Sequence, residues 1–270
     1  MPDFLYHYTT IDTLQYMFRE DHRVEFRFTD YRFLNDAEEG TFLNKYVNRQ
    51  SENFRSCLTQ TARLLFDKEK ESLNRLLLTG DKYFYIMSFG ELEDSMQFWR
   101  QDYAKDKGIC LKINTSKFES MKTVKGVSTP KFKKVIYAGL KDDMKTVFPE
   151  LKKKIEREAI KVNQGKAKLA NYRFIHFLPN PYEVKNAVWR SECEWRLVVP
   201  DKSIVDYKQD EYKIDNTGIP RTKIWIDNPF EEIILGPSFT PSYEVSIKRW
   251  LSDRGFGDIN VRCGDGVLNK

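Results

Sequence analysis

The chain has 270 residues, with 45 Lys and Arg against 40 Asp and Glu, and a formal net charge of +5. Its 19 Phe, 14 Tyr and 5 Trp exclude a disordered composition, and the length is enough for one large domain with a real hydrophobic core. The sequence contains no apolar run of about 20 residues and no recognisable secretory signal, so we expect a cytoplasmic protein that does not enter a membrane.

Cysteines and histidines do not form a metal-binding or disulfide pattern. The four cysteines lie far apart and form no CxxC pair, and the three histidines form no HExxH motif. Scattered thiols of this kind are typical of a reducing compartment. We therefore expect neither a structural metal nor a disulfide framework.

Strands and helices are predicted to alternate irregularly along the chain. Alternating or apolar runs predict strands at 3–9, 23–30, 82–90, 109–114, 133–139, 189–199, 222–227, 230–237 and 258–263, the last at a sheet edge. Helical spacing and capping residues predict helices at 10–20, 37–78, 94–108, 151–170 and 242–255. Because no βαβ unit carries a GxGxxG motif or a P-loop, a Rossmann domain and a P-loop NTPase are disfavoured. One α+β domain over 1–270 with helical insertions is the simplest architecture.

Positive charge is concentrated in the middle of the chain. Residues 117–173 contain 16 Lys and Arg against 6 Asp and Glu, and they include the run Lys152, Lys153 and Lys154. This basic helical insertion is either a solvated helix or a surface that contacts nucleic acid.

The stretch SECEWRLVVP, residues 191–200, interleaves charged and apolar side chains. Strand alternation would place Glu192, Glu194 and Arg196 on one face, with Trp195 and Leu197 on the other. The charged face is either the water-facing side of an antiparallel strand or the wall of a cleft.

Three other clusters combine polar and aromatic residues, and each has a purely structural explanation. His7 in YHYT is typical of a hydrogen-bonded packing histidine, and Asn35 in FLNDAEEG is typical of a helix cap. Ser88 ends the strand IMSFG, and Trp99 in the helix after it has the spacing of a core aromatic.

In combination, these motifs resemble a known family. The ordered set LYHYT, FLNDAEEG, SFG…DS…FWRQDYAKDKGICL, K…W…ECEWRL and EIILGP is similar to DUF2971, a domain of unknown function. The resemblance extends from about Phe4 to Leu251. It identifies no activity by itself.

A weaker resemblance is to the ADP-ribosyltransferase superfamily, whose members grip NAD between two small sheets. It implies a split β-sheet core in which the first strand supplies His7, a second strand supplies Ser88, and a later strand supplies the pair Glu192 and Glu194. The sequence departs from that superfamily at Tyr8, where a glycine is common, and after Ser88, where a Ser–Thr–Ser run is replaced. A member that binds a nucleotide without turnover therefore stays an alternative.

The ADP-ribosyltransferase resemblance also implies residue roles. Glu194 would stabilise the oxocarbenium-like ribose and hold its 2′-hydroxyl, while Glu192 would orient or deprotonate the acceptor. His7 would bond a ribose hydroxyl or the carboxamide, and Tyr8 or Phe89 would cover the nicotinamide. Arg196 would either contact the cofactor or only neutralise the glutamates. The complete expected NAD-binding set is His7, Tyr8, Thr9, Asn35, Ser88, Phe89, Trp99 and Arg196.

Two functions of different classes follow. The first is an enzyme that transfers ADP-ribose from NAD to a macromolecule such as nucleic acid, or that hydrolyses NAD. As a toxin or phage-defence effector it would have a cognate antitoxin or defence partner. The second is a non-catalytic module that binds nucleic acid or protein through its basic segment. A metal-dependent nuclease has less support, because a charged loop and a helix cap explain Glu91, Glu93 and Asp94.

Overall fold

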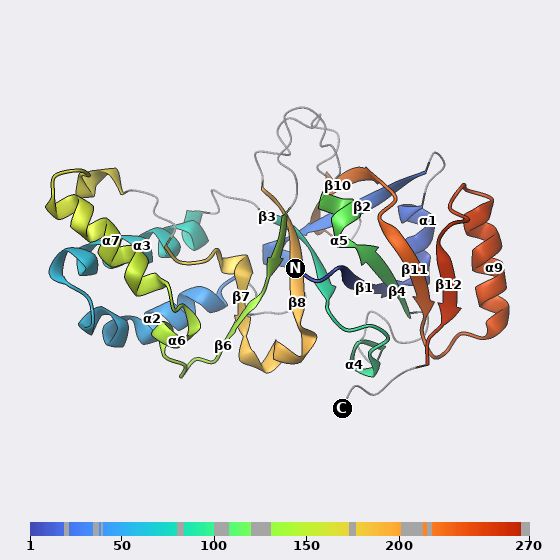
Figure 1. Cartoon of the computed structure of the whole chain (residues 1–270), viewed down its shortest axis with the longest axis horizontal. Coiled ribbons are helices and arrows are strands. Elements are labelled where there is room, and N and C mark those ends of the chain that lie inside the picture. The colour runs from blue at the N-terminus through green and yellow to red at the C-terminus, as the bar shows by residue number, and fades with distance from the viewer. Residues whose placement is uncertain are drawn as a thin grey trace. The chain divides into compact units, whose positions relative to one another are not determined.

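The computed structural model describes residues 1–18, 22–34, 38, 40–79, 84–99, 108–119, 131–172, 177–200, 213–214 and 218–265. The chain forms two compact units, each built from separate segments. The sheet unit comprises Met1–Asp30, Tyr85–Lys133 and Glu192–Lys270, and the helical unit comprises Tyr31–Phe84 and Lys134–Ser191. Both can be followed by colour in Figure 1.

A mostly antiparallel sheet forms the centre of the sheet unit. Its strands pair in the order β12-β11-β4-β1-β3-β2-β10-β9, and β8 pairs with both β3 and β5. Strand β12 runs parallel to its neighbour, β11. The strand bounds are β1 Phe4–Thr10, β2 Arg23–Asp30, β3 Phe84–Gly90, β4 Gly108–Asn114, β5 Lys131–Lys134, β8 Glu194–Pro200, β9 Lys213–Ile214, β10 Pro220–Asp227, β11 Phe230–Leu235 and β12 Asn260–Cys263.

The sheet divides at β3, because β1 and β2 pair with this strand at different points along its length. Strand β1 pairs with β4 along its whole length, from Phe4 to Thr10, but meets β3 only where Tyr6 faces Gly90. Further back along β3, Ile86 and Tyr85 pair with β2. Because β3 also pairs with β8, it is the strand from which the short β8–β5 branch leaves the main sheet.

Short helices complete the sheet unit. They are η1 Ile11–Thr13, α1 Leu14–Met17, α4 Met96–Trp99, α5 Thr115–Glu119 and α9 Pro241–Ser252. Helix α9 lies beside β12 (Figure 1), and it turns Ile247 and Leu251 inward.

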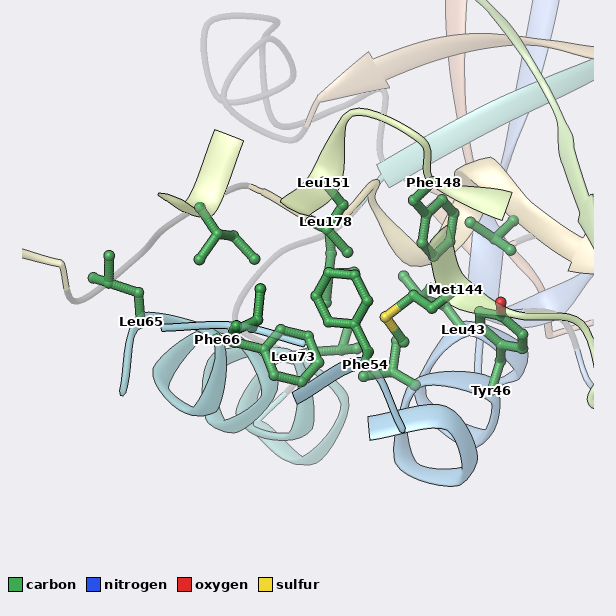
Figure 2. Packing of buried hydrophobic residues seen from close by; sticks show 14 of the residues in the cluster. Leu43, Tyr46, Phe54, Leu65, Phe66, Leu73, Met144, Phe148, Leu151 and Leu178 are labelled. Atoms are coloured by element: carbon green, nitrogen blue, oxygen red, sulfur yellow. The ribbon is translucent and has the colours of Figure 1, made fainter. Parts of the chain in front are cut away.

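The helical unit surrounds a core of its own. Figure 2 shows Phe54 and Phe66 meeting Leu73, Met144 and Leu178 in that core. Helix bounds are η2 Tyr31–Phe33, α2 Phe42–Ser56, α3 Gln60–Thr79, α6 Met144–Val147, α7 Leu151–Asn163, η3 Leu169–Asn171, η4 Pro181–Glu183 and η5 Ala187–Glu192. Two short strands, β6 Ile136–Ala138 and β7 Val184–Asn186, pair in parallel.

The coarse fold expected from the sequence is confirmed, since a mostly antiparallel sheet is combined with helices. Strand β2 has the expected bounds, and β12 lies at the sheet edge as expected. The expected strand 133–139 is wrong as one element. It divides at Val135 into β5 and β6, because the chain leaves the sheet unit at Lys133.

Two helix predictions also need correction. The expected helix at 10–20 reduces to η1 and the four-residue α1, and the region 37–78 contains α2 and α3 separated at Cys57–Thr59. Of the helix expected at 94–108, α4 covers Met96–Trp99, residues 100–107 lie outside the described residues, and Gly108 already belongs to β4. Within the described residues no helix combines the length and the apolar character needed to cross a bilayer.

Candidate functional site

Glu194 and Arg196 form a buried ion pair at the start of β8. Arg196 donates from Nε to Glu194 Oε1 at 2.8 Å and from Nη2 to Oε2 at 3.0 Å. Glu194 is 5% exposed and Arg196 is 1% exposed. A two-pronged guanidinium–carboxylate contact fixes the orientation of both groups. The interpretation in which the charged face of this strand lies in water is therefore wrong for these two residues.

Ser88 of β3 completes the support of this carboxylate. Its hydroxyl donates to Glu194 Oε1 at 2.6 Å, across the pairing of β3 with β8. Three charged or polar groups from two strands thus converge on one point. Ser88 and Glu194 are 106 positions apart in the sequence, and the pairing of β3 with β8 brings them together.

His7 of β1 contacts the backbone of the same residue, Ser88. Its Nδ1 lies 2.8 Å from the carbonyl oxygen of Ser88. Because a carbonyl only accepts, Nδ1 carries the proton, and Nε2 of the neutral ring is an acceptor. Desolvation lowers the pKa of His7, and the bond to Ser88 opposes that shift, so the ring is neutral near pH 7.

The division of the sheet explains the position of His7. Strands β1 and β3 pair at Tyr6 and Gly90 but do not continue as a ladder. The carbonyl of Ser88 would otherwise lose a partner on that side, and the His7 imidazole supplies one.

Aromatic rings hold the imidazole in place. The Phe89 ring lies 5.5 Å from His7 between centroids, at a tilt of 52°. Phe132 of β5 packs edge-on against Phe89 at 5.4 Å, and Phe118 packs against Phe132 at 5.3 Å. Phe89 is 2% exposed, so its ring supports His7 as part of the core.

Tyr8 and Trp99 belong to another cluster. The Tyr8 hydroxyl donates to the Leu92 carbonyl at 2.8 Å and accepts from the Ser95 amide at 2.9 Å. Its ring stacks on Phe98 at 4.5 Å, and Trp99 meets it edge-on at 5.0 Å. Tyr8 and Trp99 thus belong to the buried cluster that contains Cys110. The structure does not bring them to Glu194.

Glu192 does not share a strand with Glu194. It is the last residue of η5, and Cys193 follows with a φ of 45°, in the left-handed region. The strand therefore begins only at Glu194, and the expected common face of the two glutamates is wrong. Glu192 is partly exposed.

The remaining expected site residues lie apart or outside the described residues. The Thr9 hydroxyl is 2.9 Å from that of Thr13. Asn35 lies outside the described residues. Lys152, Lys153 and Lys154 are exposed on α7 in the helical unit, and Lys153 lies 3.8 Å from Glu150.

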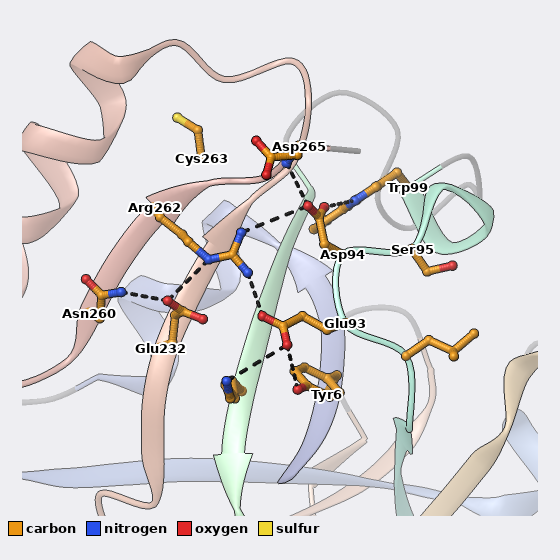
Figure 3. A network of polar contacts seen from close by, with 12 residues as sticks. Tyr6, Glu93, Asp94, Ser95, Trp99, Glu232, Asn260, Arg262, Cys263 and Asp265 are labelled. Atoms are coloured by element: carbon orange, nitrogen blue, oxygen red, sulfur yellow. Dashed lines mark hydrogen bonds and ion pairs between the residues drawn. The ribbon is translucent and has the colours of Figure 1, made fainter. Parts of the chain in front are cut away.

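A polar network that the sequence did not predict follows β3 directly (Figure 3). Glu93 accepts from Tyr6 Oη at 2.9 Å and from Arg262 Nη2 at 2.6 Å. Asp94 accepts from Trp99 Nε1 at 2.8 Å and from the Asp265 amide at 2.6 Å. Spacing could not reveal it, because Arg262 is 169 positions from Glu93. In the described part of the chain, no group of three or more His, Cys, Asp or Glu is arranged to hold a metal ion.

Comparison with known proteins identifies a family model that matches part of the chain. No curated protein and no solved structure matches the chain significantly, so the resemblance to ADP-ribosyltransferases has no support from that side. Residues 98–197, less than half of the chain, match the family model described as "Protein of unknown function (DUF2971)". That segment includes the end of α4, all of α7 and the start of β8 with Glu194 and Arg196. The match supports the resemblance to DUF2971 that the five sequence motifs indicate.

Proposed function

We propose that the protein cleaves the nicotinamide–ribose bond of NAD and passes the ADP-ribosyl group to a macromolecule or to water. The observation that carries this proposal is the Glu194 carboxylate, which Ser88 and Arg196 hold in one orientation, while His7 donates to the backbone carbonyl of the same Ser88. A preorganised, desolvated carboxylate is the group that such a reaction requires.

Cleavage of the bond leaves its electron pair on nicotinamide and positive charge on the ribose. Glu194 would stabilise that oxocarbenium-like charge and accept a hydrogen bond from the 2′-hydroxyl. The acceptor then attacks C1′ and loses its proton, and the partly exposed Glu192 would take that proton or orient the acceptor. With water as the acceptor, the same steps hydrolyse NAD.

His7 suits a second contact with the ribose. Its protonated Nδ1 is committed to Ser88, so Nε2 presents a lone pair. A ribose hydroxyl is a donor of matching chemistry. Loss of NAD or modification of a cellular macromolecule would harm a cell, as a toxin or a phage-defence effector does.

The test is nicotinamide release from NAD by the purified protein, with and without RNA, DNA or cell lysate. We expect release by the wild type and its loss in Glu194→Gln, with the fold checked by circular dichroism. The matched control is Glu231→Gln, a partly exposed strand glutamate paired with Lys117 at 2.8 Å, which should retain release. Equal release by both variants, or none by the folded wild type, would contradict the proposal.

A second candidate function rests on helix α7. The buried face of this helix consists of Leu151, Ile155 and Ala159. Its exposed face carries Lys152, Lys153, Lys154, Arg157 and Lys161. A basic helix surface of this kind suits the phosphates of nucleic acid.

This binding proposal is tested by the affinity for RNA and DNA at increasing salt. Replacing Lys152, Lys153 and Lys154 by Gln should weaken binding and flatten its salt dependence, while Glu194→Gln should bind as the wild type does. Replacing Lys248 and Arg249 of α9 by Gln is the control for general loss of charge. Binding that does not respond to salt would rule this function out.

A further inference from the structure

The five residues that follow β3, Glu91–Ser95, are each anchored to another element of the sheet unit. The carbonyl of Leu92 and the amide of Ser95 both bond the Tyr8 hydroxyl. Glu93 and Asp94 bond the groups shown in Figure 3. Asp94 has a φ of 49°, a conformation that needs such support. This segment, which we name the β3 anchor, therefore has a fixed position relative to β1 and β12.

Glu91, the first residue of the β3 anchor, reaches β8. Its Oε1 accepts a hydrogen bond from Trp195 Nε1 at 2.6 Å. The backbones also approach closely here, because a Cβ added to Gly90 would lie 3.3 Å from the carbonyl oxygen of Glu192. Trp195 is the immediate neighbour of Glu194, so this bond acts at the point where the candidate carboxylate is positioned.

Strand geometry makes the two contacts complementary. Successive side chains of β8 point to opposite faces, so Trp195 leaves the strand on the side opposite Glu194. The bond that Ser88 donates to Glu194 holds one face of the strand start, and the bond that Trp195 donates to Glu91 holds the other. Since Cys193 breaks the extended backbone just before Glu194, β8 has no preceding strand residue to fix its rotation.

We propose that Glu91 is a positioning residue that, through Trp195, sets the orientation of Glu194 toward the ribose. The effect of Glu91 on catalysis rests on the proposed function. Its effect on the position of Glu194 does not. A carboxylate that must meet a developing charge loses effectiveness when it shifts by a fraction of an ångström. Glu91 itself would touch neither substrate nor acceptor.

The kinetic test compares Glu91→Ala with Glu91→Gln. The alanine variant should lower kcat for nicotinamide release by roughly 10-fold to 100-fold with KM within about twofold of wild type. Gln keeps a carbonyl oxygen at the same distance along the side chain, so Glu91→Gln should restore most of kcat. Trp195→Phe removes the donor and should behave as Glu91→Ala does.

Glu93→Ala is the matched control, because Glu93 lies two positions away in the same segment but bonds Tyr6 and Arg262. It should lower the melting temperature and leave kcat close to the wild-type value. If Glu93→Ala and Glu91→Ala lower kcat equally, or if Glu91→Gln does not recover, the positioning role is wrong and the segment is only structural.

A second readout does not require activity. The Trp195 indole N–H resonance, assigned by its absence in Trp195→Phe, should move in Glu91→Ala. Amide hydrogen exchange of Glu194–Arg196 should accelerate there and not in Glu93→Ala. If the wild type releases no nicotinamide but these shifts appear, the proposed function fails and the positioning of β8 stands. If exchange in β8 does not change, the positioning role fails whatever the activity.

Discussion

Two buried glutamates of this chain differ in what surrounds their carboxyl groups. Glu194 faces the guanidinium of Arg196, a full counter-charge. Glu69 of α3 is 4% exposed, and its Oε1 accepts the backbone amides of Phe177 and Leu178, at 2.9 and 3.1 Å. Its Oε2 is buried without a partner among the described residues. Desolvation raises the pKa of Glu69 from 4.5 to about 7, although the two amide bonds oppose the rise.

Glu69 therefore makes stability depend on pH. Its pKa is higher in the folded protein, so its contribution is complete below about pH 4.5 and is lost as pH rises through 7. Once the pH is above 7, the free energy of unfolding has fallen by about 3 kcal/mol in total. We expect Glu69→Gln to be more stable than wild type at pH 8 and to lose this slope in urea unfolding at pH 5 and 8.

The control for that experiment is Glu71→Gln on the same helix, which is 68% exposed and pairs with Arg75. It should change stability by less than about 1 kcal/mol at either pH. The same pH dependence in wild type and Glu69→Gln would show that Glu69 does not titrate near neutrality.

The Glu194–Arg196 pair predicts strong coupling. Removing one member leaves a buried charge without compensation, so Arg196→Met should lower the free energy of unfolding by about 3–5 kcal/mol. The double variant with Glu194→Gln should lose less than the sum of the two single changes. Denaturant unfolding of the four proteins measures this, and additive losses would mean that the pair does not interact.

At the scale of elements, one apolar face of α7 packs the helix against the core of the helical unit. Leu151, Ile155 and Ala159 recur every four residues and are 2%, 0% and 1% exposed, so they enter the core of the helical unit. The apolar Ile160 lies on the outer side and is 54% exposed. Residue type alone therefore does not decide what an isoleucine of this helix contributes.

A matched pair of substitutions tests this. Ile155→Ala should lower the free energy of unfolding by about 2–5 kcal/mol, because it leaves a cavity in the core. Ile160→Ala should change it by no more than about 0.5 kcal/mol. Thermal and urea unfolding provide the values, and similar losses in both variants would contradict the assigned orientation of α7.

At the scale of the whole molecule, each unit buries apolar residues of its own. The core of the helical unit consists entirely of residues from 42–73 and 138–184, and the cluster around Tyr8 and Cys110 lies in the sheet unit. Separate cores allow separate local openings, even though the chain passes between the units several times.

Amide hydrogen exchange should reveal this separation. Phe54→Ala, at a fully buried position of α2, should accelerate exchange in α2, α3 and α7 by roughly 100-fold or more. Amides of β1, β4 and β11 should exchange at the wild-type rate, and Ile233→Ala in β11 should give the reverse pattern. Equal acceleration throughout the described residues would show one cooperative unit.

The sequence alone determined several local elements and the coarse class. Alternation defined β2 and the edge strand β12, and the rough helical spacing of apolar residues indicated the helix α7, because these signals lie within a few consecutive residues. The expected resemblance to ADP-ribosyltransferases also grouped His7, Ser88 and Glu194 in one predicted site. That they meet could not be read from spacing.

Only the tertiary structure decided which of those residues lie together. The division of the sheet at β3 brings His7, Ser88, Glu194 and Arg196 into one chain of contacts, and the left-handed Cys193 removes Glu192 from the strand. The bond from Ser88 to Glu194 and the bond from Trp195 to Glu91 join residues 106 and 104 positions apart in the sequence. Such contacts follow from strand order and burial, which are properties of the folded chain and are absent from any short stretch of sequence.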